Sequence, residues 1–266
     1  MNQDILINNA FSKQSHYFDT IEIDNPILEW IRRQIREHLE TFLVSESHIL
    51  ELNSGTGLDA IYFAKKGHRV FATDIAEGMI EQIKQKVSDE NLSERIKVKH
   101  ASFEKLKLNN DQQFNYVFSN FSGLNCAADL EKVINQFIHN LQANSYVTFV
   151  LLPKICPWEI IYLLKGKFRF AFRRFSKNST GRIAGSTIRL FYHSINKIKR
   201  AFGNQFRLIK IQGVACFSFP PFMLKYAHKY PRFYRILTRI DERLCNIFPF
   251  NRLCDLYIVT MQYKPK

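Results

Sequence analysis

Two glycines and one acid carry the clearest chemical signal in the sequence. Gly55 and Gly57 follow a short apolar run at 49–52, within the stretch LELNSGTGLDA (50–60). Glycine permits sharp turns and a close approach of the backbone to a ligand. Asp74 ends a second apolar run, 17 residues after Gly57. In open α/β sheets an acid at the end of the second strand meets a ribose, so this spacing predicts a site for an adenosine-containing ligand.

Two other nucleotide-binding patterns are disfavoured by the residues that follow the glycines. A dinucleotide site of the G-x-G-x-x-G type needs a third glycine, whereas Gly57 is followed by Leu58, Asp59 and Ala60. A triphosphate-binding loop needs a lysine after the pattern G-x-x-x-x-G, and the sequence offers none here.

The pattern of apolar residues predicts a mostly parallel α/β sheet. Strands alternate with helices of about ten residues through the first half of the chain, which is typical of crossover units with helices on both faces. This regular order lapses after Pro153 and again after Pro220 and Pro221. We expect helices at 26–43, 57–66, 77–88 and 129–141, and strands at 48–52, 69–73, 96–100, 114–119, 145–152, 206–212 and 255–263.

These lapses define the expected domain organisation. Residues 1–153 form a Rossmann-like half, and residues 154–266 complete the same sheet. Two insertions, at about 154–205 and 218–254, interrupt this second part. Because they follow late strands of the sheet, we expect them to cap the substrate side of the ligand site.

Positive charge is concentrated in the same late segment. The net charge is +14, and 19 Lys and Arg residues lie between 154 and 239 against a single acid, Glu159. Seventeen aromatic residues are interleaved with them, as in KGKFRFAFRRF (165–175). This mixture suits an anionic partner such as a membrane surface, an anionic amphiphile or a nucleic acid. The alternative is a set of core helices with a solvated cationic face.

The amino-acid composition bears on the cellular compartment, on disulfides and on metal binding. The first thirty residues lack an apolar core of signal-peptide length, and no stretch reaches the ~20 apolar residues that span a bilayer. The five cysteines are odd in number, widely spread and without a C-x-x-C pair, so we expect neither a disulfide framework nor a metal site. We therefore expect a cytoplasmic protein, with peripheral contact at the inner face of the membrane as a further hypothesis.

Several stretches resemble a known family. ELNSGTG (51–57) is similar to the first motif of class I methyltransferases that use S-adenosylmethionine: an acid, an apolar residue, a glycine, a small residue and Gly-x-Gly. The resemblance continues through GHRVFATDIAEGMIEQIKQK (67–86) and FNYVFSNFSGLN (114–125), and it covers about residues 10–152. The late part looks like a bacterial branch that acts on small molecules. The resemblance implies S-adenosylmethionine as the cofactor and a Rossmann-like, seven-stranded, mostly parallel sheet with late cap insertions.

The resemblance also implies which residues bind the cofactor. Asp74 is expected to bind the ribose, and Ile75 and Met79 to pack against the adenine. An N-terminal lid helix that carries Tyr17 is expected to close over the cofactor. The implied set is Tyr17, Glu51, Asn53, Gly55, Thr56, Gly57, Asp74, Ile75, Met79, Ser102, Phe103 and Asn120.

Two positions depart from the family pattern. Asn53 replaces the usual first glycine, and its amide is expected to bond the amino-acid end of the cofactor. HASFEKL (100–106) offers Ser102 where the family usually has an acid for the adenine amine. The hydroxyl of Ser102 and the backbone amide of Phe103 can take over that contact.

A histidine in the first insertion is the first candidate for a general base. Methyl transfer is an in-line displacement that needs mainly positioning, but an acceptor hydroxyl or protonated amine also needs a base near neutral pH. His193 lies in RLFYHS (189–194) beside Tyr192, which can bond or stack on the substrate. The alternative is that His193 caps the helix that begins near 194. His16 is the second choice.

Two further polar residues have two interpretations each. Asn120 follows the fourth strand and is expected to bind the methionine amine or the substrate; otherwise it serves the turn. Glu159 either forms an ion pair with a nearby arginine, which we favour, or binds a cationic group of the substrate.

Three functions fit these observations. The first is a methyltransferase for a hydrophobic or amphipathic small molecule, such as a lipid, an isoprenoid or a polyketide-like metabolite. The second is an RNA or other nucleic-acid methyltransferase; it is disfavoured because SNFS (119–122) stands where base-methylating relatives carry Asp/Asn-Pro-Pro-aromatic. The third is a non-catalytic partner protein that binds S-adenosylmethionine. The methyl acceptor, the methylated atom and the oligomeric state stay open.

Overall fold

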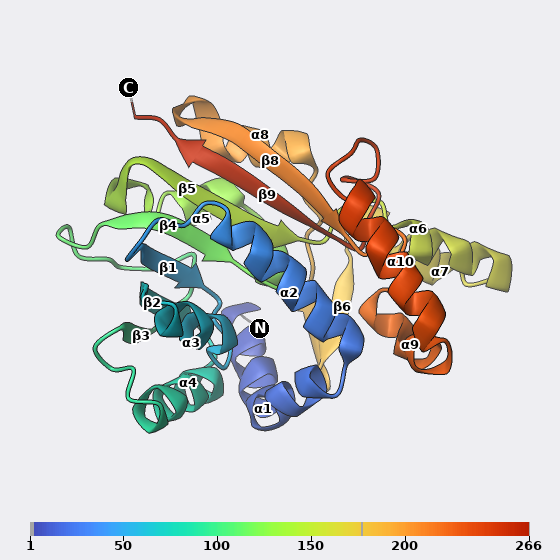
Figure 1. Ribbon diagram of the computed structural model, residues 1–266, viewed down its shortest axis with the longest axis horizontal. Coiled ribbons are helices and arrows are strands. Elements are labelled where there is room, and N and C mark those ends of the chain that lie inside the picture. Colours follow the sequence, from blue (N-terminus) through green and yellow to red (C-terminus); the bar gives the residue numbers. More distant parts are fainter. Residues whose placement is uncertain (1–2, 177, 266) are drawn as a thin grey trace.

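A seven-stranded sheet organises the molecule, as the computed structural model shows for residues 3–176 and 178–265 (Figure 1). Its strands are β1 (His48–Leu52), β2 (Arg69–Asp74), β3 (Ile96–His100), β4 (Phe114–Ser119), β5 (Leu141–Leu151), β8 (Phe206–Val214) and β9 (Leu256–Tyr263). They pair in the order β3-β2-β1-β4-β5-β9-β8, and only β9 runs antiparallel to its neighbours. The predicted α/β, Rossmann-like, mostly parallel sheet is confirmed.

Helices connect the strands and cover both faces. The α-helices are α1 (Gln3–Ile23), α2 (Pro26–Glu40), α3 (Leu58–Lys65), α4 (Glu77–Asp89), α5 (Leu130–Ile134), α6 (Pro157–Ile160), α7 (Phe168–Ala171), α8 (Ile195–Phe202), α9 (Leu224–Lys229) and α10 (Pro231–Leu244). Short 3-10 helices are η1 (Gly123–Cys126), η2 (Ile138–Asn140), η3 (Ile161–Lys165), η4 (Arg173–Phe175), η5 (Gly203–Gln205) and η6 (Pro221–Met223). A separate hairpin pairs β6 (Thr180–Ile183) with β7 (Ser186–Arg189).

One predicted helix is much shorter in the structure. The expected helix at 129–141 is limited to α5 and, after a short gap, η2, and β5 begins four residues before the predicted start at 145. The reason is local. The side-chain amide of Asn140 donates to the backbone carbonyls of Asn109 and Gln112, which holds the chain in a turn before the strand. The other predicted elements agree with the structure to within three residues at each end.

Helix α2 illustrates why these segments fold as they do. The side chain of Asn25 accepts hydrogen bonds from the backbone amides of Ile27 and Leu28, and Pro26 occupies the first helical position. Ile27, Ile31, Ile35 and Leu39 then form one fully buried stripe at four-residue spacing. Burial of such a side chain contributes roughly 1.5–3 kcal/mol, so α2 is fixed against the sheet mainly by this stripe.

The sheet separates two hydrophobic cores because successive side chains of a strand face opposite sides. Buried residues of α2, α3 and α4 pack with Ile49 of β1 on one face. Buried residues of α5 and α8 pack with Leu50 and Leu52 on the other. Glu51 lies between them in sequence and therefore points to the α2 and α3 side, where a carboxylate is unusual.

The two insertions lie at the carboxyl edge of the parallel strands. The first leaves the end of β5 and the second follows the end of β8, and both strands run parallel to β1, β2 and β4. Figure 1 shows α6, α7, α9 and α10 grouped beyond this edge. Among the described residues, no helix combines the length and apolar character that a membrane span requires.

Candidate functional site

A cavity of about 120 Å³ lies at the carboxyl ends of β1, β2 and β4, beneath helix α1. This is the edge where open α/β sheets bind ligands. Nine of the twelve predicted cofactor residues line it: Glu51, Asn53, Gly55, Thr56, Asp74, Ile75, Met79, Phe103 and Asn120. Other lining residues, which the sequence analysis did not assign to the site, are Ile7, Phe11, Phe18, Arg32, Ser54, Leu58, Asp59, Ala101, Phe121, Gly123 and Cys126.

Three predicted residues do not line the cavity. Tyr17 is 43% exposed, and its neighbour Phe18 faces the cavity instead. The Ser102 hydroxyl accepts a hydrogen bond from the backbone amide of Glu104, so Ser102 serves a turn. Gly57 has a positive φ of 84° and caps α3, and an added Cβ would lie 2.4 Å from Ile83. Gly57 therefore permits the close packing of α3 and α4.

The glycine loop and Asp74 form one bonded unit. The backbone amide of Gly55, with φ of 58°, donates to the Asp74 carboxylate at 2.8 Å. The amide of Ala76 donates to its other oxygen at 2.8 Å. Burial raises the pKa of Asp74 above its usual value, although these amides favour the ionised form. The strand end thus presents an oriented carboxylate beside the apolar side chains of Ile75 and Met79.

The side chain of Asn53 lines the cavity and also forms two hydrogen bonds within the protein. Its side-chain amide donates to the carbonyl of Asn120 at 2.9 Å, and its carbonyl oxygen accepts from the Ser119 hydroxyl at 2.5 Å. Its φ of 51° is a left-handed conformation that Asn tolerates. One of the two N–H groups of the Asn53 amide is thus bonded to the loop after β4, and the bond from the other N–H to the amino-acid end of the cofactor stays a prediction.

The space for Asn53 depends on Gly123. An ideal Cβ at Gly123 would lie 2.4 Å from Asn53 Cγ, well inside van der Waals contact. We expect Gly123→Ala to destabilise the protein by about 1–3 kcal/mol through this overlap. Urea unfolding should then show partial recovery in the double variant Asn53→Gly/Gly123→Ala, because the overlapping side chain is gone. Equal losses in the single and double variants would contradict this contact.

Glu51 is the most unusual charge in the cavity. It is almost fully buried, and its Oε2 atom has no hydrogen-bond partner among the described residues. Burial and the nearby Asp59 carboxylate raise the pKa of Glu51 well above its usual value, and Arg32 and Arg36 only partly oppose this. A buried carboxyl oxygen without a donor is costly. The cavity therefore holds a ready acceptor for a cationic or hydrogen-bond-donating ligand group.

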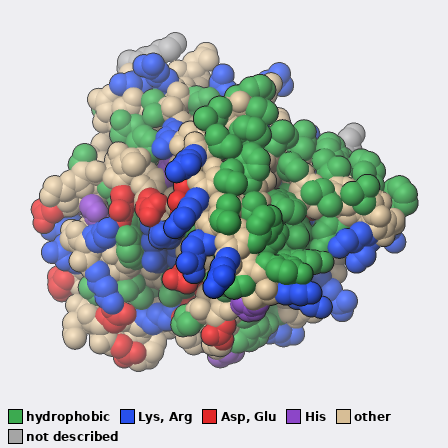
Figure 2. Space-filling view, turned by 45° about the vertical axis from the view of Figure 1, so that its right-hand side comes forward, with side chains coloured by type: hydrophobic (Ala, Val, Ile, Leu, Met, Phe, Trp, Pro, Cys, Tyr) green, Lys and Arg blue, Asp and Glu red, His purple; other side chains and the backbone are tan. Residues whose placement is uncertain are grey.

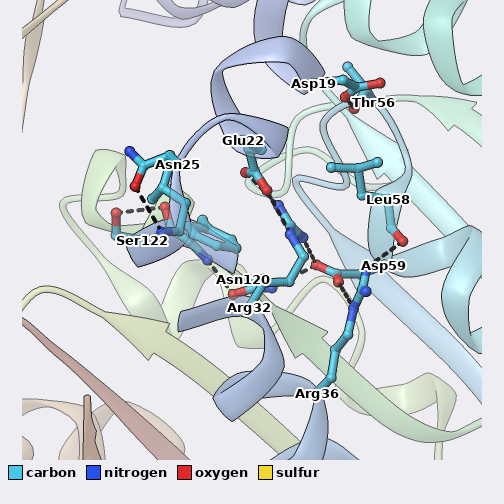
Figure 3. Close-up of polar contacts among 12 residues, drawn as sticks. Asp19, Glu22, Asn25, Arg32, Arg36, Thr56, Leu58, Asp59, Asn120 and Ser122 are labelled. Atoms are coloured by element: carbon cyan, nitrogen blue, oxygen red, sulfur yellow. Dashed lines mark hydrogen bonds and ion pairs between the residues drawn. The ribbon is translucent and has the colours of Figure 1, made fainter. Parts of the chain in front are cut away.

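A second carboxylate, Asp59, is fully paired by two arginines of α2 (Figure 3). Arg32 binds Asp59 and also Glu22 of α1, the latter at 2.6 Å, and Figure 3 shows its guanidinium between the two acids. Arg36 donates to Asp59 at 2.7 Å and Asn120 does so at 2.7 Å. Burial alone would raise the pKa of Asp59, but the arginines outweigh it and lower that pKa. This network fixes α1, α2, α3 and the loop after β4 around the cavity.

Helix α1 covers the cavity; its closing over a bound cofactor as a lid stays a prediction. Ile7, Phe11 and Phe18 lie on one helical face and line the cavity from above. The hydroxyl of Thr56 donates to Asp19 of α1 at 2.5 Å, and Lys86 binds the same carboxylate. The glycine loop is thus fastened to α1 through a polar contact, in addition to the apolar side chains.

His193 and Tyr192, the predicted catalytic pair, do not line this cavity. His193 is fully buried, and its Nε2 donates to the carbonyl of Ala127 at 3.0 Å. Burial lowers its pKa to about 4, which is too low for an efficient base near neutral pH. Tyr192 is also buried and lies against Arg174. The alternative of a helix cap is wrong too, because Ser194 caps α8.

Other predicted polar residues have structural partners. Glu159 is buried and bonds Arg173 at 2.6 Å and Arg174 at 2.7 Å, so the favoured ion-pair interpretation is confirmed. Arg174 also forms an ion pair with Asp255 at 2.5 Å. The carboxylates of Glu159 and Asp255, which lie close to Cys156, are therefore both paired with Arg174. His16 is exposed on α1 and does not line the cavity.

A family model and a curated relative match the part of the chain that builds the cavity. The model, described as a methyltransferase domain, matches residues 49–144. The relative is the ubiquinone/menaquinone biosynthesis C-methyltransferase UbiE of Rickettsia massiliae (strain Mtu5), which is 31% identical over 137 residues. That match covers 49% of this chain and 54% of the relative. The chain therefore spans about half the length of the curated relatives it matches.

Solved structures match over most of the chain at low sequence identity. A methyltransferase dependent on S-adenosylmethionine from Methanosarcina mazei has a TM-score of 0.60 and 12% identity, covering 86% of this chain and 98% of that one. The geranyl diphosphate C-methyltransferase of Streptomyces coelicolor A3(2) has a TM-score of 0.58 and 11% identity, covering 89% and 80%. At such identities the likeness establishes the fold.

Proposed function

We propose that this protein methylates a hydrophobic or amphipathic small molecule. Residues 49–144 match a family model described as a methyltransferase domain, and the chain has the fold of solved methyltransferases that depend on S-adenosylmethionine. The observation that carries the proposal is the cavity beneath α1. It combines a glycine loop, an oriented Asp74, an unpaired Glu51 and apolar walls at the carboxyl edge of the sheet. This combination suits a cofactor with both ionic and apolar parts.

The residues of the cavity fit S-adenosylmethionine group by group. Asp74 would accept hydrogen bonds from the ribose hydroxyls, since its carboxylate is already oriented by two backbone amides. Ile75, Met79 and Phe103 would hold the adenine between apolar surfaces. The unpartnered oxygen of Glu51 would accept from the ammonium of the methionine part. That last contact supplies the donor that Glu51 lacks in this structure.

Bound S-adenosylmethionine supplies an electrophilic methyl group on a sulfonium. The role of the protein is to hold the acceptor in line with that methyl group. Positioning alone lowers the activation barrier of such a transfer by several kcal/mol. Phe11, Phe18 and Phe121 provide apolar walls, and α1 above them would exclude water from the bound reactants. These walls favour an acceptor with a substantial apolar part.

The cavity also restricts the acceptor chemistry. Its lining includes no His, Tyr or Lys among the described residues, and burial raises the pKa of the Cys126 thiol to about 12. Asp59 and Asp74 are engaged by arginines and backbone amides. We therefore infer that the acceptor arrives with a nucleophilic group that needs no strong base, such as an ionised hydroxyl or an electron-rich carbon. The names of the matched relatives, a quinone-pathway enzyme and a geranyl diphosphate enzyme, support an apolar acceptor.

The test is incubation of the purified protein with methyl-labelled S-adenosylmethionine and a cell extract. The label is then counted in organic, aqueous and nucleic-acid fractions. The proposal predicts enzyme-dependent label in the organic fraction. Label confined to nucleic acid would overturn it in favour of a nucleic-acid methyltransferase. Cofactor binding without transfer to any fraction would overturn it in favour of a non-catalytic partner protein.

Asp74→Ala should weaken S-adenosylmethionine binding by about 1–3 kcal/mol, the scale of a hydrogen bond to a charged group. Calorimetric titration of the two proteins measures this loss. Asp74→Asn is the matched control, because it keeps an acceptor for one backbone amide of the loop and isolates the effect of the charge. Equal cofactor affinity in the wild type and in Asp74→Ala would remove Asp74 from the site.

A further inference from the structure

An exposed apolar surface covers the two late insertions. Of nineteen large hydrophobic side chains exposed among the described residues, thirteen lie in these insertions. Leu164 is 88% exposed, and five phenylalanines of the insertions are at least half exposed: Phe168, Phe172, Phe175, Phe233 and Phe248. Figure 2 shows a continuous hydrophobic area on this side of the molecule. Contiguous apolar surface of this kind marks an interaction site in a folded protein.

The insertions form this surface together. Tyr162 of η3 and Phe170 of α7 both contact the ring of Phe222 of η6, at centroid distances of 5.9 and 5.5 Å. Behind it, Phe219 contacts Trp158 of the first insertion and Tyr234 of α10. Two segments that are about sixty residues apart in sequence are therefore joined by buried and half-buried rings. The outer side chains are presented on a supported surface rather than on loose loops.

Basic residues that have no acidic partner among the described residues border the same surface. Lys165, Lys167, Arg169, Lys225, Lys229, Arg232, Arg235 and Arg239 are exposed, and none forms an ion pair within the described part of the chain. Lysines lie along aromatic rings: Lys165 is 5.2 Å from the ring of Tyr162 and Lys229 is 5.2 Å from the ring of Tyr230. Figure 2 shows Lys and Arg side chains along the margins of the hydrophobic area. The apolar stems follow the surface while the charges point outward.

We propose that this surface, the insertion face, docks on a lipid bilayer that carries anionic headgroups. Short amphipathic helices with Phe and Leu on one side and Lys and Arg beside them are the elements that lie in a membrane interface. The excess of one charge sign favours anionic lipid, because each basic residue near such a surface adds to the attraction. A second copy of this chain would bring the same unpaired cations together, so charge complementarity favours the bilayer over a dimer.

The position of the insertion face gives the docking a consequence for the cavity. The insertions follow β5 and β8 at the carboxyl edge of the sheet, and the cavity lies at the same edge. A bilayer on the insertion face would therefore lie along the edge that carries the cavity. A molecule dissolved in the bilayer could then reach the protein without crossing bulk water.

Co-sedimentation with vesicles tests the proposal without cofactor or substrate, so its failure and that of the proposed methyl transfer are distinguishable. We expect the wild-type protein to bind vesicles of phosphatidylcholine with about 30 mol% phosphatidylglycerol far better than pure phosphatidylcholine vesicles. The triple variant Lys225→Glu/Lys229→Glu/Arg232→Glu should bind at least a hundred-fold more weakly. The double variant Phe168→Ser/Phe233→Ser should also lose binding, because it removes apolar contact without changing charge.

Matched controls distinguish an effect of the insertion face on vesicle binding from an effect of overall net charge. Lys84→Glu/Lys97→Glu/Lys107→Glu makes the same change in net charge at exposed lysines elsewhere, and it should leave most of the binding intact. Circular dichroism confirms that each variant is folded. Equal losses in the two triple variants would overturn the insertion face as the docking site. Absence of wild-type binding, or a concentration-dependent dimer that the Phe168→Ser/Phe233→Ser variant abolishes, would overturn the bilayer as its partner.

Discussion

Replacement of Glu51 by glutamine should weaken binding of S-adenosylmethionine about 10- to 100-fold and at the same time stabilise the free protein. The loss of affinity follows from the charge-assisted hydrogen bond that Glu51 would accept from the cofactor ammonium. The gain in stability follows from the removal of a buried carboxyl group with an unpartnered oxygen. A residue that serves only packing would not separate the two quantities in this way.

The pH dependence gives this prediction a definite sign. Burial raises the folded-state pKa of Glu51 well above its unfolded value, so the unfolded chain ionises first as the pH rises. Glu51 therefore lowers the free energy of unfolding above its unfolded pKa, and it has no such effect below that pKa. Glu51→Gln should be more stable than the wild type at neutral pH, by about 1 kcal/mol or more, with the difference vanishing near pH 4.

Two measurements check this pair of effects. Urea unfolding at neutral pH and at pH 4 gives the stability difference, and calorimetric titration at neutral pH gives the cofactor affinity. A variant that loses stability at neutral pH, or that binds the cofactor as tightly as the wild type, would contradict the assignment of Glu51.

Replacement of Arg32 by methionine should lower the free energy of unfolding by about 3 kcal/mol. Arg32 is nearly buried and binds two acids, so its removal leaves Asp59 with Arg36 and leaves Glu22 without its partner in this network. Breaking a buried ion pair on one side is strongly destabilising because the remaining charge stays buried. Arg33→Met is the matched control on the same helix, and its exposed ion pairs predict a loss of less than about 1 kcal/mol.

The double variant Arg32→Met/Asp59→Asn shows how much of the stability loss arises from the Arg32–Asp59 ion pair. It should recover part of the loss, because no unpaired carboxylate remains at position 59. The pKa of Asp59 is lowered in the folded state, so its ionised form contributes stability above its unfolded pKa that is lost as the pH falls through the folded value. The effect of Arg32→Met should therefore shrink in acid. Urea unfolding that shows equal losses for Arg32→Met and Arg33→Met would contradict the network.

The strand ends of the site were predictable from the sequence because they depend on local chain geometry. Gly55 and Asp74 sit at the ends of two adjacent parallel strands, and spacing alone brings them together. The side chains of α1 that line the cavity were not predicted from the sequence. Ile7, Phe11 and Phe18 share one face of a single long helix, which becomes visible only when 3–23 is taken as helical. That spacing favours Phe18 over Tyr17 as the residue that faces the cavity.

Long-range pairings could not be inferred in the same way. Arg32 and Asp59 lie on different helices, and nothing in their local sequence indicates that they meet. The environment of His193 depends on Ala127, 66 residues away, so its burial and low pKa were invisible from the stretch RLFYHS. Asn53 was noticed as a departure, yet its compensation by Gly123 requires the loop after β4 to fold against the glycine loop.

A crystal structure of the protein with S-adenosylhomocysteine tests the central claim most directly. The account predicts that the ligand fills the cavity beneath α1, with its ribose hydroxyls at Asp74 and its ammonium at Glu51. The adenine should lie between Ile75, Met79 and Phe103. A ligand bound elsewhere on the chain, or a cavity that stays closed by the α1 side chains at saturating ligand, would contradict it.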